Sequence, residues 1–426
     1  MEYREARAVL DRLPWLEVKP GLSRTGRLLD LLGHPERAFP AVHVAGTNGK
    51  GSVVAMLDAV LRRAGYRVGR FTSPELVDFR DRIAIDDRWL PETDWAAGVS
   101  RIRPSLDSVA DRPTRFEAVT ALAFDAFARQ AIDIALVETG LGGRFDATNL
   151  VRPIVSVLCN VALDHCAVLG GSIEQIAWEK AGIAKRGVPL LIGEVPPQAL
   201  AVVLAECAEV GAVPVDADRI DVQGTGGDWG STTYRVVREG LPQTIELGLL
   251  AEYQRDNLQV ALGVLELLRE QGFAVSDAAI VGGLREARWP GRFEVVRRTP
   301  NVVLDGAHNV AGAKRLAEEV ERLVPERGHR RLLLGILKDK DVDGIARSLA
   351  ESVDCVTLCA STSPRALRAV QLQKRVGGLF LQSTWYDSVE GALERLVPSL
   401  SGRETLVIAG SLSVVAEARR WFGEDR

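Results

Sequence analysis

Short runs of β-branched and other apolar residues alternate with amphipathic, helix-like stretches along nearly the whole chain. This alternation is typical of parallel sheets whose strands are connected by crossover helices. In the first part of the chain it predicts strands at Ala41–Ala45, Arg67–Thr72, Asp133–Glu138 and Ile154–Asn160, and helices at Ser52–Ala64 and Ala118–Ala131. We expect these elements to form one doubly wound domain.

A break in this pattern predicts a domain boundary. A Gly-rich stretch at Val222–Gly248 is expected to form a β-hairpin, and a helix at Asn257–Gln271 follows it. A proline and a glycine then interrupt regular structure within the string ARWPGR. We therefore predict a first domain over residues 1–288, a linker near 289–292 and a second domain over 293–426.

The second domain repeats the alternation on a smaller scale. Its expected strands are Asn301–Leu304, Arg331–Leu334, Cys355–Cys359, Leu379–Leu381 and Thr405–Ala409. The predicted fold class is α/β, with two doubly wound domains of which the second is smaller and Rossmann-like.

A phosphate-binding loop is the strongest local signal. The string VAGTNGKGS follows an apolar strand and opens a helix whose apolar residues share one face. Its glycines let backbone N–H groups turn inward, the helix N-terminus offers unpaired donors, and Lys50 adds a point charge for phosphates. Against the pattern G-x-x-x-x-G-K-[ST], Val44 takes the first glycine's place and Gly51 separates lysine from serine. The first domain is thus predicted to bind a nucleotide through Thr47, Asn48, Gly49, Lys50, Gly51 and Ser52.

Composition narrows the function classes. The net charge of −4 and the lack of a long basic run argue against a nucleic-acid surface. Five cysteines without a C-x-x-C pair fit a reducing compartment. The N-terminus lacks the apolar core of a signal peptide, and no stretch of about 18 apolar residues follows it. We expect a cytoplasmic monomer with no nucleic-acid or membrane partner.

Polar residues just past predicted strands are candidates for a metal site, because ligands of open parallel sheets bind outside the carboxyl ends. Ser73 follows one strand, Glu138 ends another, and Asp164 and His165 follow a third. Such side chains could converge on Mg²⁺ bound to ATP, since Mg²⁺ favours oxygen ligands. The residues alone leave His165 open as a structural side chain and Glu138 open as the cap of a turn.

Longer strings carry a family resemblance over nearly the whole chain. They are HVAGTNGKGS, RFEAVT, GLGGRFDATN, LDH with EKAGI, LDGAHN and GSLS. In these strings the chain resembles the folylpolyglutamate and dihydrofolate synthases, folate synthetases of the Mur ligase superfamily. It departs from the family pattern at Glu75, where TSPHL has histidine, at Val310, where DGAHNP has proline, and at Ser413, where tyrosine often follows GSL.

The resemblance implies how the ions are held. Ser73, Glu138 and His165 match the family's magnesium ligands, and Ser52 joins them from the phosphate loop. Two Mg²⁺ ions are implied, with a monovalent cation as a further candidate. Lys180, in the EKAGI segment, matches the lysine that becomes carbamylated, a change that turns a cation into a carboxylate-like anion. From sequence alone Lys180 could equally be a solvated or salt-bridged side chain.

The resemblance also implies a pterin pocket. Its segments here are Leu22, Ser23, Arg24, Phe116, Glu117, Phe145, Asp146 and Ala147. Without the family, Phe116 reads as a core residue and Glu117 as a first-turn charge favoured by the helix dipole. Arg144 and Asp146 could instead form a structural ion pair.

Strings on both sides of the predicted boundary imply nucleotide contacts. By resemblance Asn257, Arg292 and Asp305 contact ATP, and His308 lies near the reacting phosphate. Lys50, His308 and Lys180 are therefore the predicted catalytic residues. Without the family, each second-domain residue would be an ordinary polar loop side chain.

The implied activity is an ATP-dependent, ADP-forming ligase. It adds L-glutamate to dihydropteroate, to the γ-carboxylate of reduced folates, or to both, through an acyl phosphate. A Mur-type cell-wall amino-acid ligase is an alternative, although a nucleotide-sugar-binding N-terminal domain has no room before Gly46. A non-catalytic nucleotide-binding regulator is a second alternative, which the intact Lys50, Glu138 and Asp305 argue against.

Overall fold

The computed structural model describes residues 1–14, 21–108 and 111–424, and the chain divides into two compact units. The first unit comprises Met1–Gln223, Tyr234–Glu246 and Arg255–Ala287; the second comprises Gly224–Thr233, Leu247–Gln254 and Arg288–Arg426. Two segments that precede the predicted linker thus group with the second unit. Among the described residues, no helix is both long and apolar enough to cross a membrane.

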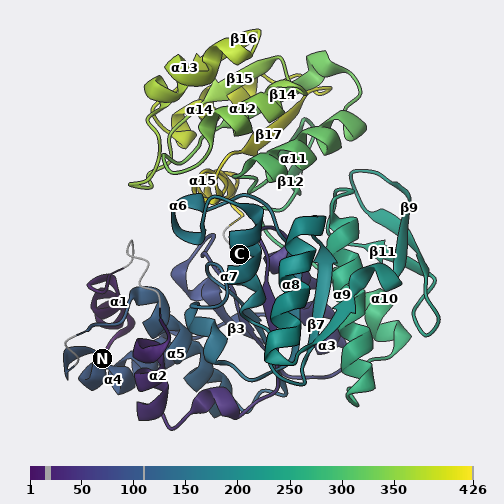
Figure 1. Cartoon of the computed structure of the whole chain (residues 1–426). Coiled ribbons are helices and arrows are strands. Elements are labelled where there is room, and N and C mark those ends of the chain that lie inside the picture. Colours follow the sequence, from purple (N-terminus) through teal and green to yellow (C-terminus); the bar gives the residue numbers. More distant parts are fainter. Residues whose placement is uncertain (15–20, 109–110, 425–426) are drawn as a thin grey trace. The chain divides into compact units, whose positions relative to one another are not determined.

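The first unit is built on an eight-stranded sheet in the order β4-β3-β2-β5-β1-β6-β7-β8. Figure 1 labels β3 and β7 of this sheet. Its strands are β1 (Ala41–Ala45), β2 (Val68–Phe71), β3 (Ile83–Ile85), β4 (Arg88–Trp89), β5 (Ile134–Glu138), β6 (Pro153–Asn160), β7 (Pro189–Glu194) and β8 (Val213–Asp216). β3 and β4 are antiparallel additions, and the other six strands run parallel. The carboxyl ends of those six strands therefore share one edge.

Helices cover both faces of this sheet. Alternate residues of a strand point to opposite faces, and Ala41 and Ala45 of β1 lie in cores on the same face. The helices that pack there are α1 (Tyr3–Asp11), α2 (Ser23–Leu31), α4 (Glu92–Ser108), α5 (Arg115–Arg129), α7 (Ile173–Ala181) and α8 (Pro197–Val210). Against the other face, α9 (Gln254–Glu270) brings Gly263 onto Leu191. α3 (Lys50–Arg63) and α10 (Asp277–Glu286) pack on each other, and α6 (Cys166–Leu169) is a single turn.

The second unit contains a six-stranded sheet in the order β12-β13-β17-β14-β15-β16. Its strands are β12 (Glu294–Arg298), β13 (Asn301–Leu304), β14 (Arg330–Leu334), β15 (Cys355–Leu358), β16 (Gln382–Trp385) and β17 (Thr405–Ala409). Only β12 is antiparallel. One face carries α11 (Val310–Leu323), α12 (Val342–Ala350) and α13 (Ala369–Val376), while α14 (Val389–Ser399) and α15 (Leu412–Phe422) pack on each other.

A separate three-stranded sheet in the order β11-β10-β9 forms where the sequence predicts a hairpin. Its strands are β9 (Asp221–Gly227), β10 (Thr232–Val237) and β11 (Thr244–Leu247). Its residues are divided between the two units, because the β9–β10 turn groups with the second unit.

One expected strand needs correction, and several strands were not expected. The strand predicted at Leu379–Leu381 is wrong, because two glycines at 377 and 378 start a 3₁₀ turn instead, Leu381 is exposed, and the strand begins at Gln382. The strands that the sequence did not predict are β3, β4, β7, β8 and β12. The α/β class and the parallel sheets agree with the prediction.

Candidate functional site

The phosphate loop lies at the carboxyl edge of the first sheet, between β1 and α3. Gly49 is the N-cap of α3 with φ +82°, so Lys50 is the first helical residue. The end of β6 fixes the loop: Asn160 accepts from Asn48 N through its Oδ1 at 2.9 Å and donates from its Nδ2 to Asn48 O at 3.0 Å. Thr47 Oγ1 also donates to Ala162 O at 3.1 Å. The helix N-terminus is thus held open toward the edge where an anion would bind.

Asn160 is a site residue that the sequence interpretation missed. The available signal was its position, since it is an amide side chain at the carboxyl end of a predicted strand.

Two lysines meet on one carbonyl in this loop. The Nζ of Lys50 donates to Gly46 O at 3.0 Å and the Nζ of Lys180 to the same oxygen at 2.9 Å. Lys180 is buried, and its burial, with the charge of Lys50, lowers its pKa to about 7. The structure therefore brings two predicted catalytic residues together, and at pH 7 about half of the Lys180 amine is neutral, far more than for an ordinary lysine.

Oxygen ligands gather beside the loop. Ser73 N donates to Glu138 Oε2 at 3.2 Å, and Glu138 Oε1 lies 3.9 Å from Lys50 Nζ. Among the described residues, none hydrogen-bonds to the buried Ser73 Oγ, and Ser52 is buried in the first turn of α3. An unsatisfied buried hydroxyl beside a carboxylate fits a hard cation such as Mg²⁺, which takes oxygen ligands.

His165 is placed differently from these oxygens. It is the N-cap of α6 with φ +51°, and its Nε2 lies 3.9 Å from Asp164 Oδ1. Its side chain is 37% exposed. In the part of the chain that the structure describes, no three His, Cys, Asp or Glu side chains gather as a metal-binding group. These contacts thus join Ser73 to Glu138 and pair His165 with Asp164.

Asn257 of α9 lies against the phosphate loop. A Cβ built on Gly49 would come within 2.1 Å of Asn257 Oδ1, and Asn257 is buried. Glycine at position 49 therefore allows both the positive φ of the loop and the close approach of the Asn257 amide.

Gly49→Ala is expected to lower the free energy of unfolding by about 2–4 kcal/mol, because it adds left-handed backbone strain to a steric clash. Urea unfolding measures the loss. Adding Asn257→Ala to Gly49→Ala should recover the clash component and leave the backbone component. Equal urea midpoints for Gly49→Ala and the unchanged chain would show that the loop accommodates the added methyl group without loss of stability.

The predicted pterin residues Arg24 and Glu117 form a buried ion pair. Arg24 Nε donates to both carboxylate oxygens of Glu117, at 3.0 and 3.1 Å, and Arg24 Nη1 lies 3.2 Å from Asp111 Oδ2. Glu117 Oε2 also accepts from Thr114 N at 2.6 Å, which completes the capping box of α5. Both side chains thus tie α2 to the start of α5.

We expect Glu117→Ala to lower the free energy of unfolding by about 3 kcal/mol, since it leaves the buried Arg24 guanidinium without its main partner. Chemical denaturation monitored by far-UV circular dichroism measures this. Phe145→Ala, at a side chain that is 44% exposed, is the matched control and should change stability little. If Glu117→Ala were as stable as Phe145→Ala, the Arg24–Glu117 ion pair would not stabilise the fold as we expect.

The other pterin-side residues divide between the sheet edge and the surface. The Phe116 ring packs on Phe71 with centroids 5.8 Å apart and fills the space above Gly140, just past β5. Phe145 lies 6.4 Å from the Trp178 ring. Leu22 is the N-cap of α2 and Ser23 its first residue, while Ala147 is buried in a 3₁₀ turn.

Both carboxylate oxygens of Asp146 accept hydrogen bonds from residues of its own loop. Its Oδ2 accepts from Gly140 N and Leu141 N, both at 2.9 Å, and its Oδ1 from Thr148 N and Oγ1. The alternative ion pair with Arg144 is wrong, because Arg144 Nη2 instead lies 2.6 Å from Glu206 Oε2.

In the second unit, Asp305 follows β13, and both of its carboxylate oxygens accept hydrogen bonds. Its Oδ2 accepts from Tyr253 Oη at 2.6 Å and Phe293 N at 2.9 Å, and its Oδ1 from Ala307 N at 2.8 Å. Burial raises the pKa of Asp305 above its usual range. Tyr253 was not predicted, although it opens the YQRDN string that carries Asn257.

Arg292 and His308 lie near Asp305. A Cβ built on Gly306 would come within 2.3 Å of Arg292 Nη1, and His308 Nδ1 donates to Gly306 O at 2.8 Å. The second unit therefore brings the Arg292 guanidinium from before β12 to the loop after β13 that carries Asp305 and His308.

At three positions the chain departs from the family pattern, and the structure shows what surrounds each of them. Glu75 Oε2 accepts from Arg82 Nε at 2.7 Å, and although burial opposes it, this guanidinium lowers the pKa of Glu75. Val310 is the first residue of α11 and is 38% exposed. Ser413 Oγ lies 2.8 Å from Ser361 Oγ and 3.1 Å from Ser411 Oγ.

Comparison with known proteins places this geometry in a family. A family model described as "Mur ligase, glutamate ligase domain" matches residues 291–412. The chain is 35% identical to the dihydrofolate synthase/folylpolyglutamate synthase of Bacillus subtilis over 98% of both chains. It is 33% identical to the folylpolyglutamate synthase of Lacticaseibacillus casei, over 99% of this chain and 98% of that one.

Solved structures agree. The folylpolyglutamate synthase of Mycobacterium tuberculosis complexed with ADP superposes with a TM-score of 0.90 at 33% identity, covering 99% of this chain and 98% of that one. Escherichia coli FolC in complex with DHPP and ADP gives 0.88 at 30% identity, over 99% and 98%. On these full-length similarities, the chain belongs to the dihydrofolate synthase/folylpolyglutamate synthase family of ligases.

Proposed function

We propose that this ligase joins L-glutamate to the carboxylate of dihydropteroate, of a reduced folate, or of both. The observation that carries the proposal is the phosphate loop at the carboxyl edge of the first sheet, with Lys50, Glu138 and the Ser73 hydroxyl around it. The family's named activities agree with a ligase that consumes ATP and releases ADP.

The chemistry explains the need for ATP. A free carboxylate is a poor acyl donor because its oxygen leaves badly, so its conversion to an acyl phosphate must precede attack by the amine of glutamate. Phosphoryl transfer depends mainly on positioning and on positive charge near the transferred group. The N–H groups at the start of α3 and the Lys50 ammonium are suited to that role. Lys50 would leave Gly46 O for the phosphates when ATP binds.

The residues around the loop fit magnesium. Glu138, Ser73 and Ser52 would hold it, and Mg²⁺ there would neutralise charge on the phosphate oxygens. His165 remains a candidate ligand by family resemblance.

Lys180 is the proposed site of carbamylation. A carbamate forms when a neutral amine adds to CO₂ and loses a proton, and the lowered pKa of Lys180 favours the neutral amine. The product would place an anion where the structure has a buried amine against Gly46 O. It would thereby provide one more oxygen ligand near the phosphate loop.

Asn257, Arg292 and Asp305 would contact ATP, and His308 would lie near the reacting phosphate. For the acceptor, Phe116 is well placed by its position at the sheet edge. Arg24, Glu117 and Asp146 would act mainly by holding the loops around it, because their polar atoms are engaged within the protein.

ADP release by the purified protein tests the function. We expect ATP turnover to be stimulated by glutamate with dihydropteroate, by glutamate with tetrahydrofolate, or by both, and mass spectrometry of the product should show one added glutamate. Stimulation by neither acceptor, together with activity on a peptidoglycan precursor, would overturn the proposal in favour of a cell-wall ligase. ATP binding without any acceptor-stimulated turnover would favour a non-catalytic regulator.

A further inference from the structure

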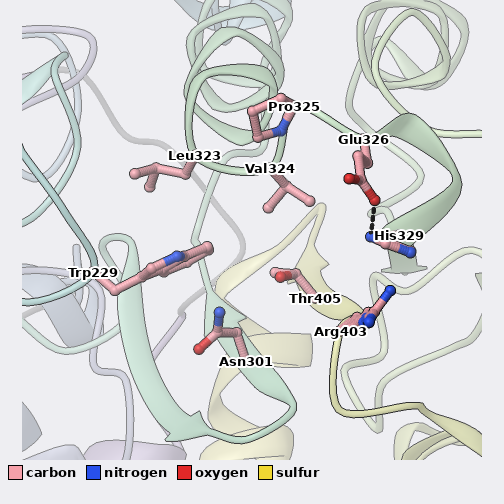
Figure 2. Close-up of a pocket in the computed structure, with 9 residues that line it drawn as sticks. All are labelled: Trp229, Asn301, Leu323, Val324, Pro325, Glu326, His329, Arg403 and Thr405. Carbon is pink, nitrogen blue, oxygen red and sulfur yellow. Dashed lines mark ion pairs between the residues drawn. The ribbon is translucent and has the colours of Figure 1, made fainter.

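A cavity lies within the second unit (Figure 2). It measures about 410 Å³ and is lined by Trp229, Asn301, Leu323, Val324, Pro325, Glu326, His329, Arg403 and Thr405. Its volume falls in the range of small-molecule sites, roughly 300–1,000 Å³.

The sheet places this cavity opposite the predicted nucleotide residues of the same unit. Asn301 is the first residue of β13 and Thr405 the first of β17, and the two are register partners in a parallel pair. Asp305 follows the carboxyl end of β13. The cavity therefore opens at the amino edge of the sheet, while Asp305, Arg292 and His308 belong to the carboxyl edge.

The aromatic wall is held in place by its own turn. Trp229 stacks on the buried Phe293 with centroids 6.3 Å apart and planes at 20°. Asp228 fixes the turn, because its Oδ1 accepts from Gly230 N at 2.6 Å and Ser231 N at 3.3 Å. Leu323, Val324 and Pro325 form an apolar wall (Figure 2). The cavity thus has a fixed indole and a hydrophobic side.

Three polar side chains of the lining have no protein partner among the described residues. Throughout the described ranges, the guanidinium of Arg403, the amide of Asn301 and the indole N–H of Trp229 have no hydrogen bond or ion pair. Glu326 is already paired, with its Oε2 2.7 Å from His329 Nδ1. Cationic and neutral donors therefore remain available to the cavity while this carboxylate is engaged.

From this arrangement we infer that the cavity binds a small planar aromatic carboxylate. The ring would lie against the Trp229 indole and the apolar wall, and the carboxylate would accept hydrogen bonds from Arg403 and Asn301. The ligand could be a free aromatic acid or the aromatic acid portion of a larger molecule. The site is separate from the proposed ligase reaction and does not depend on it.

The indole N–H signal of Trp229 tests the inference in the full-length protein. The chain has eight tryptophans, and Trp229→Phe identifies the one signal that belongs to the cavity in a ¹⁵N–¹H spectrum. We expect p-aminobenzoate, or p-aminobenzoyl-L-glutamate, to shift that signal saturably. The tighter of the two probes tells whether a free acid or the ring of a larger molecule is preferred, and binding of either supports the site.

Arg403→Gln separates this site from binding elsewhere. Arg403 is exposed, so its loss should leave the fold intact and weaken the Trp229 response about five- to tenfold. Arg395→Gln, at an exposed arginine of α14 outside the cavity, is the matched control and should bind as the unchanged protein does. No shift of the Trp229 signal at millimolar probe, or equal affinity in Arg403→Gln and the control, would overturn the inference.

Discussion

Lys50→Ala is expected to lower kcat for acceptor-stimulated ADP release by roughly 10²–10³-fold, which corresponds to about 3–4 kcal/mol of transition-state stabilisation. The reason is local: Lys50 is the only side-chain cation of the phosphate loop, and it stands at the N-terminus of α3 beside Glu138. Steady-state ADP release at saturating ATP measures the effect. The melting temperature should stay within about 2 °C, because the hydrogen bonds of this side chain go to the backbone of its own loop and its ion pair with Glu138 is long, at 3.9 Å.

Two further variants sharpen this prediction. Lys374→Ala removes an exposed lysine of α13 in the second unit and should keep full activity. Lys50→Arg keeps the charge but brings a bulkier fork into the loop, so it should recover nucleotide binding more than turnover. If Lys50→Ala retained substantial turnover, Lys50 would lose its assigned role and the phosphates would have to be neutralised by other groups.

Features that depend only on neighbouring residues in the chain were predictable from the sequence. The bounds of β1, β13 and β17 match the expected strands residue for residue, because each is an apolar run closed by polar or glycine positions. The phosphate loop followed from the same local logic, since strand, glycines and helix start are contiguous. Glu138 and Ser73 could be paired in advance because neighbouring parallel strands end at one edge.

What could not be predicted depends on partners far apart in the chain. Glu117 meets Arg24 from 93 positions away, and nothing local distinguishes that bond from a contact with substrate. Asp146 uses both carboxylate oxygens for hydrogen bonds within its own loop, and a sequence motif does not show these bonds. The edge strand β12 has the sequence EVVRR, in which two of five residues are apolar, and its last two residues are exposed. Such a short apolar run does not predict a strand. Tertiary contacts and edge exposure thus set the limit of the sequence interpretation.

Replacing Lys180 should show whether the active form carries an amine or a carbamate there. Lys180→Arg keeps a cation that cannot be carbamylated, and we expect it to lower kcat by roughly 10²-fold or more if the anion holds a metal ion near the phosphates. Lys180→Ala should be equally inactive, but added acetate should restore part of its activity because a free carboxylate can occupy the vacated volume. Intact-mass spectra under ¹³CO₂, with mild trapping of the carbamate, report the modification directly. Full activity of Lys180→Arg would overturn the carbamate and leave Lys180 as a simple cation.

The stability of the protein gives an independent readout of the same amine. Its folded pKa of about 7 lies below the ordinary value of 10.5, so between these two values the unfolded chain holds a proton that the folded chain lacks. The free energy of unfolding contributed by this group therefore rises as pH increases from about 7 toward 10.5, and is lowest below pH 7. Lys180→Met removes the group, so its unfolding free energy should exceed that of the unchanged protein near pH 7 and should lack this part of the pH slope. Denaturant titrations in CO₂-free buffer at pH 7, 8 and 9 measure both. An identical slope in the two proteins would mean that the amine keeps its proton in the folded state, which would also make it a poor acceptor for CO₂.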